Sequence, residues 1–281
     1  MQPRFERPAS VAQATGLLAA RPWAVLAGGT DLYPAHVGRT IALPLLDIGG
    51  IAELRGIRRD GAGWTIGATT TWSDVARADL PPLFDALRSA AREVGGVQIQ
   101  NTGTVAGNLC NASPAADGTP VLLAMGARVV LQSARGVREL AVDEFVLGNR
   151  RTARADDELV VAVRIPARSE RARSAFAKLG GRRYLTIAVT AVAVVVDTGA
   201  DATVSAVGIA VGSCAPAARR LSALEARLVG ARIDGDLAAT VEDQDLAPLA
   251  PIDDVRGSAA YRIDATRTLL GRALGEVAAR R

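Results

Sequence analysis

The chain has 281 residues, 49% hydrophobic and 22% charged, a composition typical of a globular protein with one large or two to three small domains. Its formal charge is only +4, both signs are mixed along the chain, and 4% aromatic content argues against nucleic-acid binding. Two cysteines and one histidine, His36, exclude a four-thiolate zinc or iron–sulfur site built by this chain alone.

The N-terminal residues 1–10 lack the apolar core of a signal peptide. The longest mainly apolar run, residues 187–196, is about half the length needed to span a bilayer and is rich in valine. These features predict a cytoplasmic protein without membrane insertion. Cys110 and Cys214 are therefore expected to be free thiols.

Residues 1–55 are expected to form a small α/β unit. The spacing of Val11, Leu17 and Leu18 predicts a helix over residues 10–20. Short apolar runs predict strands at residues 23–27 and 45–48.

Residues 56–168 are expected to form a second unit of helices and strands. An amphipathic helix is predicted over residues 81–94, with prolines in its first turn, where missing N–H groups cost little. A polar, glycine-rich stretch at residues 101–117 is interpreted as a loop, followed by a short helix at 119–125. Strands are predicted at residues 64–68, 128–132, 138–142 and 158–165.

Residues 169–281 are expected to form a sheet followed by helices. Antiparallel strands are predicted at residues 174–179, 187–197 and 203–211, and helices at 221–229, 237–240 and 258–279. Apolar residues recur at helical spacing in the last helix and predict a core stripe of Tyr261, Leu269, Leu270, Ala273, Leu274 and Val277. The element order indicates an α+β protein.

Two glycine-rich loops, residues 25–32 and 101–117, carry the main indication of a ligand site. Glycine permits positive φ and close approach of a ligand to backbone N–H groups. Neither loop contains a lysine or arginine, so a bound diphosphate would be held by N–H groups and hydroxyls. Neither matches the common nucleotide motifs, and plain turns remain the structural alternative for both.

Asp31 is awkward for a diphosphate site, because a carboxylate beside a diphosphate is repulsive unless it points away or caps a helix. Pro34 suits an early helical position shortly after it. Capping and ligand contact are both open for Asp31.

Several motifs in order resemble the molybdenum hydroxylase flavoproteins, which include the medium subunits of carbon monoxide dehydrogenase-like enzymes and the central domain of xanthine dehydrogenase. The strongest are NTGTVAGN at residues 101–108 and ASPAAD at 112–117, similar to the FAD-binding signature. AGGTD at 27–31 resembles the first FAD loop of the same family. The resemblance runs over residues 5–274 and includes FVLGNRRT at 145–152, KLGGRRYLTIA at 178–188 and AYR at 260–262.

This resemblance implies an FAD-binding fold of the vanillyl-alcohol-oxidase/PCMH type, with two α/β subdomains at residues 1–55 and 56–168. A C-terminal flavoprotein domain at residues 169–281 would contain a three-stranded antiparallel sheet with a helical bundle. FAD would lie between the first two units, and the third would cover the flavin edge.

The resemblance also places FAD contacts on this sequence. The first loop would wrap the diphosphate and ribitol, the second would supply N–H groups and polar side chains, and Asp117 would hold a polar part of FAD. Val160 would pack against the flavin, and Lys178 would lie at the flavin end. Ala106 stands where the family usually has glycine, so that position must tolerate a Cβ. The expected FAD-binding residues are Val25, Leu26, Ala27, Gly28, Gly29, Thr30, Asp31, Leu32, Thr104, Ala106, Gly107, Asn108, Asp117, Val160 and Lys178.

Lys178 is the only lysine in the chain, and its compact ammonium could stabilise negative charge on a reduced flavin; chance survival is the alternative. His36 is a candidate catalytic base or a hydrogen-bonded structural histidine. Cys110 is expected as an apolar filler of the FAD loop. Tyr184 is a candidate for packing near the flavin or an ordinary tyrosine. No side chain is assigned as a metal ligand, general acid or general base.

By resemblance, the chain is an electron-transfer subunit of a heterotrimer. A large molybdopterin-binding subunit and a small subunit with [2Fe–2S] clusters would be its partners, arranged as a dimer of heterotrimers. Electrons would pass through FAD to NAD, a quinone, oxygen or another acceptor. The alternatives are a stand-alone FAD-dependent oxidoreductase with its own small-molecule substrate, which would need an acid/base residue at the flavin, and a scaffold whose flavin site has decayed.

Overall fold

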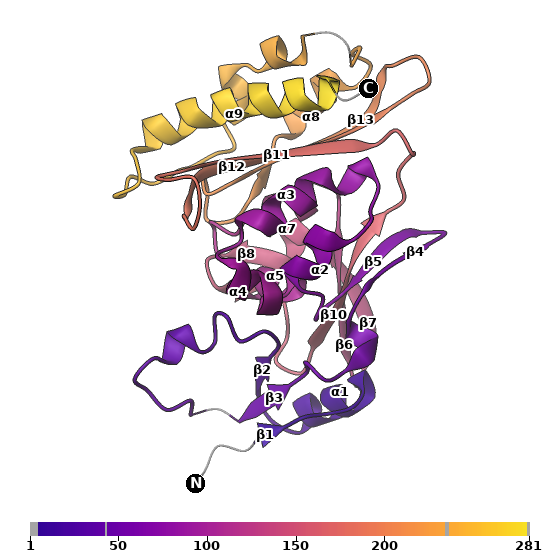
Figure 1. The fold of residues 1–281 in the computed structure, drawn as a ribbon, viewed down its shortest axis with the longest axis vertical. Helices are drawn as coiled ribbons and strands as arrows, with labels where there is room; N and C mark the ends of the chain where they lie inside the picture. Colours follow the sequence, from indigo (N-terminus) through magenta and orange to yellow (C-terminus); the bar gives the residue numbers. More distant parts are fainter. Residues whose placement is uncertain (1–4, 43, 234–235, 280–281) are drawn as a thin grey trace.

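The chain begins with a small parallel sheet and one helix in the computed structural model, which describes residues 5–42, 44–233 and 236–279 (Figure 1). The helix α1 (Val11–Ala20) begins after Ser10, whose hydroxyl accepts from the Gln13 amide. The sheet has the order β1 (Phe5–Glu6), β3 (Leu45–Asp47), β2 (Ala24–Leu26). The predicted helix and both predicted strands are confirmed, and β1 is an additional edge strand.

A five-stranded antiparallel sheet occupies the middle of the molecule. Its strands, in spatial order, are β4 (Ile57–Asp60), β5 (Gly63–Gly67), β10 (Leu159–Pro166), β6 (Arg128–Ser133) and β7 (Gly136–Ala141). The helices of this region are α2 (Trp72–Arg77), α3 (Asp85–Glu93), α4 (Val97–Thr102), α5 (Val105–Asn111), α6 (Gly118–Ala124) and α7 (Val142–Phe145). Short 3₁₀ turns lie at η1 (Pro34–His36), η2 (Ala52–Leu54) and η3 (Pro82–Phe84), and a small ribbon pairs β8 (Val146–Gly148) with β9 (Arg151–Thr152).

The glycine-rich stretch at residues 101–117 was predicted as a loop, and the prediction was wrong for the end of α4 and for α5, whereas residues 112–117 lie outside helices and strands. Thr104 caps α5 by accepting from the Gly107 amide, and Val105 and Leu109 are buried on its inner side. Packing of these apolar residues outweighs the low helix propensity of the intervening glycine.

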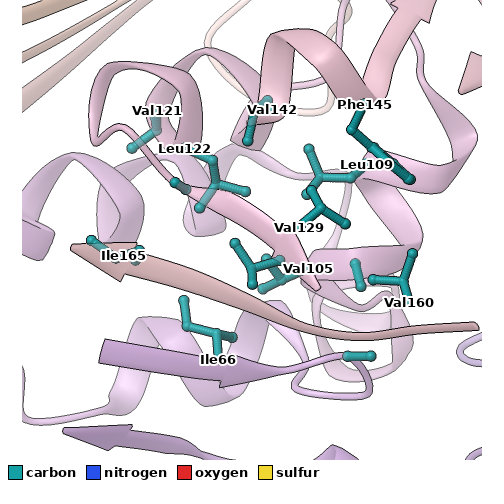
Figure 2. Close-up of a cluster of buried hydrophobic side chains, with 14 of the residues drawn as sticks. Ile66, Val105, Leu109, Val121, Leu122, Val129, Val142, Phe145, Val160 and Ile165 are labelled. Atoms are coloured by element: carbon teal, nitrogen blue, oxygen red, sulfur yellow. The ribbon is translucent and has the colours of Figure 1, made fainter. Parts of the chain in front are cut away.

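The core of the middle region lies between the sheet and helices α5 and α6 (Figure 2). Ile66 of β5, Val105 and Leu109 of α5, and Val160 of β10 all contribute to it. Full burial of each such side chain stabilises the fold by about 1.5–3 kcal/mol. The sheet therefore serves as the rigid base on which α5 is held.

The last part of the chain is an antiparallel sheet of β11 (Arg173–Gly180), β12 (Ala188–Thr198), β13 (Val204–Gly212) and β14 (Arg219–Arg220). Helices α8 (Ser222–Leu228) and α9 (Ala259–Ala279) cover one face, and α3 and α6 pack against the other (Figure 1). Two further 3₁₀ turns, η4 (Leu237–Thr240) and η5 (Asp243–Leu246), lie between these helices. The predicted strands are confirmed, and β14 is an additional short strand.

The stripe predicted for α9 is confirmed except at its start. Leu269, Leu270 and Leu274 are buried, whereas Tyr261 is 49% exposed. Tyr261 lies in the first turn, where its ring packs beside Gly257 instead of facing the sheet. Among the described helices, α9 included, none is long and apolar enough to cross a membrane.

Gly208 of β13 lets the last sheet approach α6, since a Cβ there would lie 2.0 Å from the carbonyl oxygen of Ala124. We expect Gly208→Ala to lower the free energy of unfolding by about 1–3 kcal/mol, because the two elements must separate. Urea titration checks this. The matched control is Gly275→Ala in α9, where a Cβ meets open space and should add about 0.5–1 kcal/mol. Equal stabilities of the two variants would contradict the proposed close contact.

Candidate functional site

A cavity of about 790 Å³ brings together segments that are far apart in the chain. Its walls come from residues 25–32 at the end of β2 and in the loop that follows, from residues 94–117 around α4 and α5, and from residues 185–187 between β11 and β12. Arg150 adds a side chain from the turn between β8 and β9. The volume lies within the range of about 300–1,000 Å³ found for small-molecule and cofactor sites.

The first wall runs from the end of β2 into the following loop, and every residue from Val25 to Leu32 lines the cavity. A Cβ at Gly28 would lie 1.8 Å from the carbonyl oxygen of Thr102, so only glycine lets this loop lie against the end of α4. Gly29 has a φ of +70°, which favours glycine. Within the described chain, the amides of residues 28–32 donate to no other residue, so they can meet an anion.

The second wall contains Thr104, Gly107 and Asn108, which line the cavity. Backbone amides of this wall already donate hydrogen bonds within the protein: the Val105 amide donates to the Thr70 carbonyl, and the Gly107 amide donates to the Thr104 hydroxyl. The Asn108 Oδ1 atom is buried without a hydrogen-bond partner among the described residues, and it is the polar group that this wall offers a ligand.

Ala106 and Val160 do not line the cavity. Ala106 is 3% exposed and faces the core, so its Cβ does not meet a ligand and the departure from the glycine usual in the family is accommodated. Val160 lies in the same core beside α5 (Figure 2). Both side chains therefore support the site from behind.

Asp117 lines the cavity and is paired behind it with Lys178. The Lys178 Nζ donates to Asp117 Oδ2 at 2.8 Å and to the Glu93 carbonyl at 3.4 Å, and the lysine side chain is only 5% exposed. Burial raises the pKa of Asp117 to about 6, although the Lys178 ammonium acts to lower it. The other carboxylate oxygen, Oδ1, is buried without a partner among the described groups. Lys178 itself does not line the cavity, and it affects the cavity through its ion pair with Asp117.

Arg150 lines the cavity from outside the two glycine-rich loops, and it was not among the site residues predicted from the sequence. It has a φ of +54°, and its amide donates to the carbonyl of Ala112, which fixes the β8–β9 turn against the end of α5. Burial raises the pKa of Asp31, and the Arg150 charge acts to lower it, so these two cavity residues interact electrostatically. The signal that could have found Arg150 is its place within FVLGNRRT.

Asp31 does not cap the following turn. The turn η1 begins after Tyr33 without a side-chain cap, and Pro34 occupies its first position, as the sequence indicated. The capping alternative for Asp31 was therefore wrong, and Asp31 is one of the residues that line the cavity.

The remaining candidates lie at or near the cavity with different surroundings. His36 lines it, and its Nδ1 lies 2.8 Å from the Leu32 carbonyl. Cys110 is reachable through the cavity, yet the surrounding protein raises the pKa of its thiol to about 11. Tyr184 is exposed and packs with Arg183, while its neighbours Leu185 and Ile187 line the cavity.

The chemistry of the walls suits binding and orientation rather than acid–base catalysis. Unpartnered carboxylate and amide oxygens can accept from hydroxyl and N–H groups, and the free loop amides can bind phosphate oxygens. Trp72, Ile99 and Leu185 add apolar surface suited to a planar ring. Among the residues that the structure describes, no group of three or more histidines, cysteines or carboxylates is placed to hold a metal.

Comparison with known proteins covers nearly the whole chain. Residues 1–168 match the family described as the FAD binding domain in molybdopterin dehydrogenase, and residues 174–277 match the CO dehydrogenase flavoprotein C-terminal domain. The chain is 34% identical to the carbon monoxide dehydrogenase medium chain of Hydrogenophaga pseudoflava, over 99% of this chain and 98% of that one. It is 30% identical to the nicotine 6-hydroxylase medium subunit of Paenarthrobacter nicotinovorans, over 99% and 98%.

A chain in the crystal structure of a cyanide-inactivated Cu,Mo-CO dehydrogenase has the same fold, with a TM-score of 0.90 and 29% identity over 100% of both chains. The agreement extends from the first parallel sheet to the last helix.

We expect Lys178→Ala to lower the free energy of unfolding by about 3 kcal/mol at pH 8, because it leaves the ionised Asp117 buried without its cation. At pH 5, below the Asp117 pKa of about 6, the carboxyl is protonated and the loss should be smaller. Urea titrations at both pH values measure the difference.

The control is Arg128→Ala, which removes an exposed partner of Glu139 and should cost about 1 kcal/mol or less at either pH. A pH-independent loss for Lys178→Ala would show that Asp117 is not ionised in the folded protein.

Proposed function

Because this chain belongs to the family of FAD-binding subunits of the molybdenum hydroxylases, we propose that it is the electron-transferring medium subunit of such an enzyme. Its cofactor is FAD, which supplies the redox chemistry, while the chain supplies binding, orientation and electrostatics. The observation that carries the proposal is the cavity, which joins free loop amides to unpartnered buried oxygens.

The FAD contacts proposed here follow the walls of the cavity. Residues 28–32 would hold the diphosphate through their amides, and Asn108 and Asp117 would accept from hydroxyl or N–H groups of the cofactor. Arg150 would add a positive charge near the anionic part. Lys178 would act through Asp117, by setting the charge of that carboxyl.

The other redox centres are proposed to lie on partner subunits. Each [2Fe–2S] cluster needs four ligands, and the chain has two cysteines and one histidine in all. We therefore propose a large molybdopterin-binding subunit and a small iron–sulfur subunit as partners, arranged as a dimer of heterotrimers. The external acceptor would be NAD, a quinone or oxygen.

Three structural units are proposed, at residues 1–55, 56–168 and 169–281. The parallel sheet, the five-stranded sheet and the last antiparallel sheet each fall inside one of these ranges. FAD would lie between the first two units, with residues 185–187 of the third at its edge.

A stand-alone flavin oxidoreductase is not favoured by the walls of the cavity. Its titratable groups include His36, which is bonded to a carbonyl of its own turn, and Asp117, which is paired with Lys178. An enzyme with its own organic substrate needs a positioned acid or base near the reacting atoms.

The test is to purify the chain alone and together with its partner subunits, and to record the visible spectrum, FAD, iron and molybdenum content of each. We expect FAD without iron on this chain, and iron, molybdenum and reduction of an external acceptor only in the complex. Turnover of an organic substrate by the chain alone would support the stand-alone alternative. A complex that assembles without FAD would contradict the proposal.

We expect Arg150→Gln to raise the Kd for FAD about tenfold, since it removes one charge-assisted contact worth about 1.5 kcal/mol. Equilibrium release of FAD, followed by flavin fluorescence, measures this. The neighbouring Arg151 does not line the cavity, so Arg151→Gln should leave the Kd within about twofold. Equal effects of the two changes would indicate that only the overall charge matters.

A further inference from the structure

Arg262, near the start of α9, is a buried arginine that does not line the cavity. It is 2% exposed, and its Nη2 donates to Asp254 Oδ1 at 2.7 Å. Its Nη1 donates to the carbonyls of Val189 at 2.6 Å and Ser213 at 3.2 Å. One guanidinium therefore joins the start of β12, the end of β13 and the segment that precedes α9.

The two residues whose carbonyls accept from Arg262, Val189 and Ser213, are each connected to a wall of the cavity. Val189 follows the cavity residue Ile187 by two positions in the chain. The Ser213 amide donates to the Pro114 carbonyl at 2.9 Å, and Pro114 lies between the cavity residues Ser113 and Ala115. Arg262 is thus connected to Pro114 by two successive hydrogen bonds through Ser213, and to Ile187 by one hydrogen bond to Val189, two positions along the chain.

The backbone at Ser213 is held in an unusual conformation. Its φ is +66°, in the left-handed region that a serine seldom occupies, and its side-chain oxygen is buried without a partner among the described residues. Such positions persist where the surroundings determine them, and here the amide and the carbonyl are both bonded. The strain is located at the link between Arg262 and the Pro114 wall.

A contribution to the stability of the fold does not by itself explain why an arginine is buried at position 262. Arg262 Nε is buried without a partner in the described chain, and a buried ion pair contributes little net stability compared with apolar packing. A lysine in place of Arg262 could form an ion pair with Asp254. It lacks the planar guanidinium, whose two terminal nitrogens donate to two carbonyls and a carboxylate at once.

We propose that Arg262 is a positioning residue for the FAD site, which sets the spacing between residues 113–117 and residues 185–187. The proposal rests on FAD binding in the cavity. The Asp117–Lys178 pair ties the same wall to β11, so the last sheet holds it at two points. Loss of the Arg262 link would leave the Pro114 end free to move relative to residues 185–187.

The experiment compares Arg262→Met with Arg227→Met in the assembled enzyme. Arg227 also pairs with a carboxylate, with both of its contacts to Asp245 at 2.7 Å, but its hydrogen bonds, to Asp245 and to the Thr240 carbonyl, do not lead to a wall of the cavity. We expect both variants to lower the denaturation temperature, whereas Arg262→Met alone raises the Kd for FAD about tenfold, similar to the loss of affinity when residues that orient metal ligands are changed. The visible circular dichroism of the bound flavin should also change only in Arg262→Met.

An accessible thiol gives a second readout. Cys110 lines the cavity and Cys214 is buried, so bound FAD should slow alkylation of Cys110 by N-ethylmaleimide, measured by peptide mass. At one fixed FAD concentration we expect this protection to be weaker in Arg262→Met than in the parent and in Arg227→Met. Equal protection in all three proteins would overturn the proposal.

Arg262→Lys covers the case in which Arg262→Met does not fold, because it keeps the charge beside Asp254. A Kd for FAD above the parent value supports the role of the fork, and an unchanged Kd and dichroism overturn it. If the parent enzyme assembles without FAD, the proposed function fails first. If the parent binds FAD and the Arg262 variants bind it equally well, only the positioning role fails.

Discussion

The site depends on a backbone contact that leaves no room for a side chain. Gly28 lies so close to the end of α4 that a Cβ would be 1.8 Å from the Thr102 carbonyl oxygen. This contact places the loop after β2 beside the start of α5, so that the two cavity walls face one another. The five-stranded sheet and the buried helices of the middle region pack against α5 and fix its position relative to the loop after β2.

The cavity has few charged groups, and each carboxylate of its two glycine-rich segments interacts with a cation from outside them. Asp117 is paired with Lys178 of β11, and Asp31 interacts electrostatically with Arg150. For Asp117, burial favours the neutral carboxyl and the Lys178 ammonium favours the charged one. An FAD subunit needs a stable cofactor geometry more than a proton donor, and this arrangement supplies it through backbone groups and a few paired side chains.

Much of the fold followed from local patterns. The helix over residues 10–20, the strands flanking the first glycine loop and the three long C-terminal strands follow from apolar spacing and turn residues, which act over a few positions. The glycines after a strand indicated the first loop, whereas its role in FAD binding was implied by the family resemblance. The prediction of a loop was wrong for residues 105–111. Their glycine and polar residues are typical of a loop, but Val105 and Leu109 are buried and stabilise the helix α5.

The sequence by itself therefore determined the order of elements, the family resemblance and the segments that build the site. Tertiary structure decided which side chains reach the cavity: Arg150 does, Val160 faces the core, and Lys178 lies behind Asp117. It also joined Arg262 to Ser213, 49 positions earlier in the chain. Spacing along a chain encodes which face of a helix or strand is apolar, but the meeting of distant side chains depends on sheet register and helix packing, which only the folded chain contains.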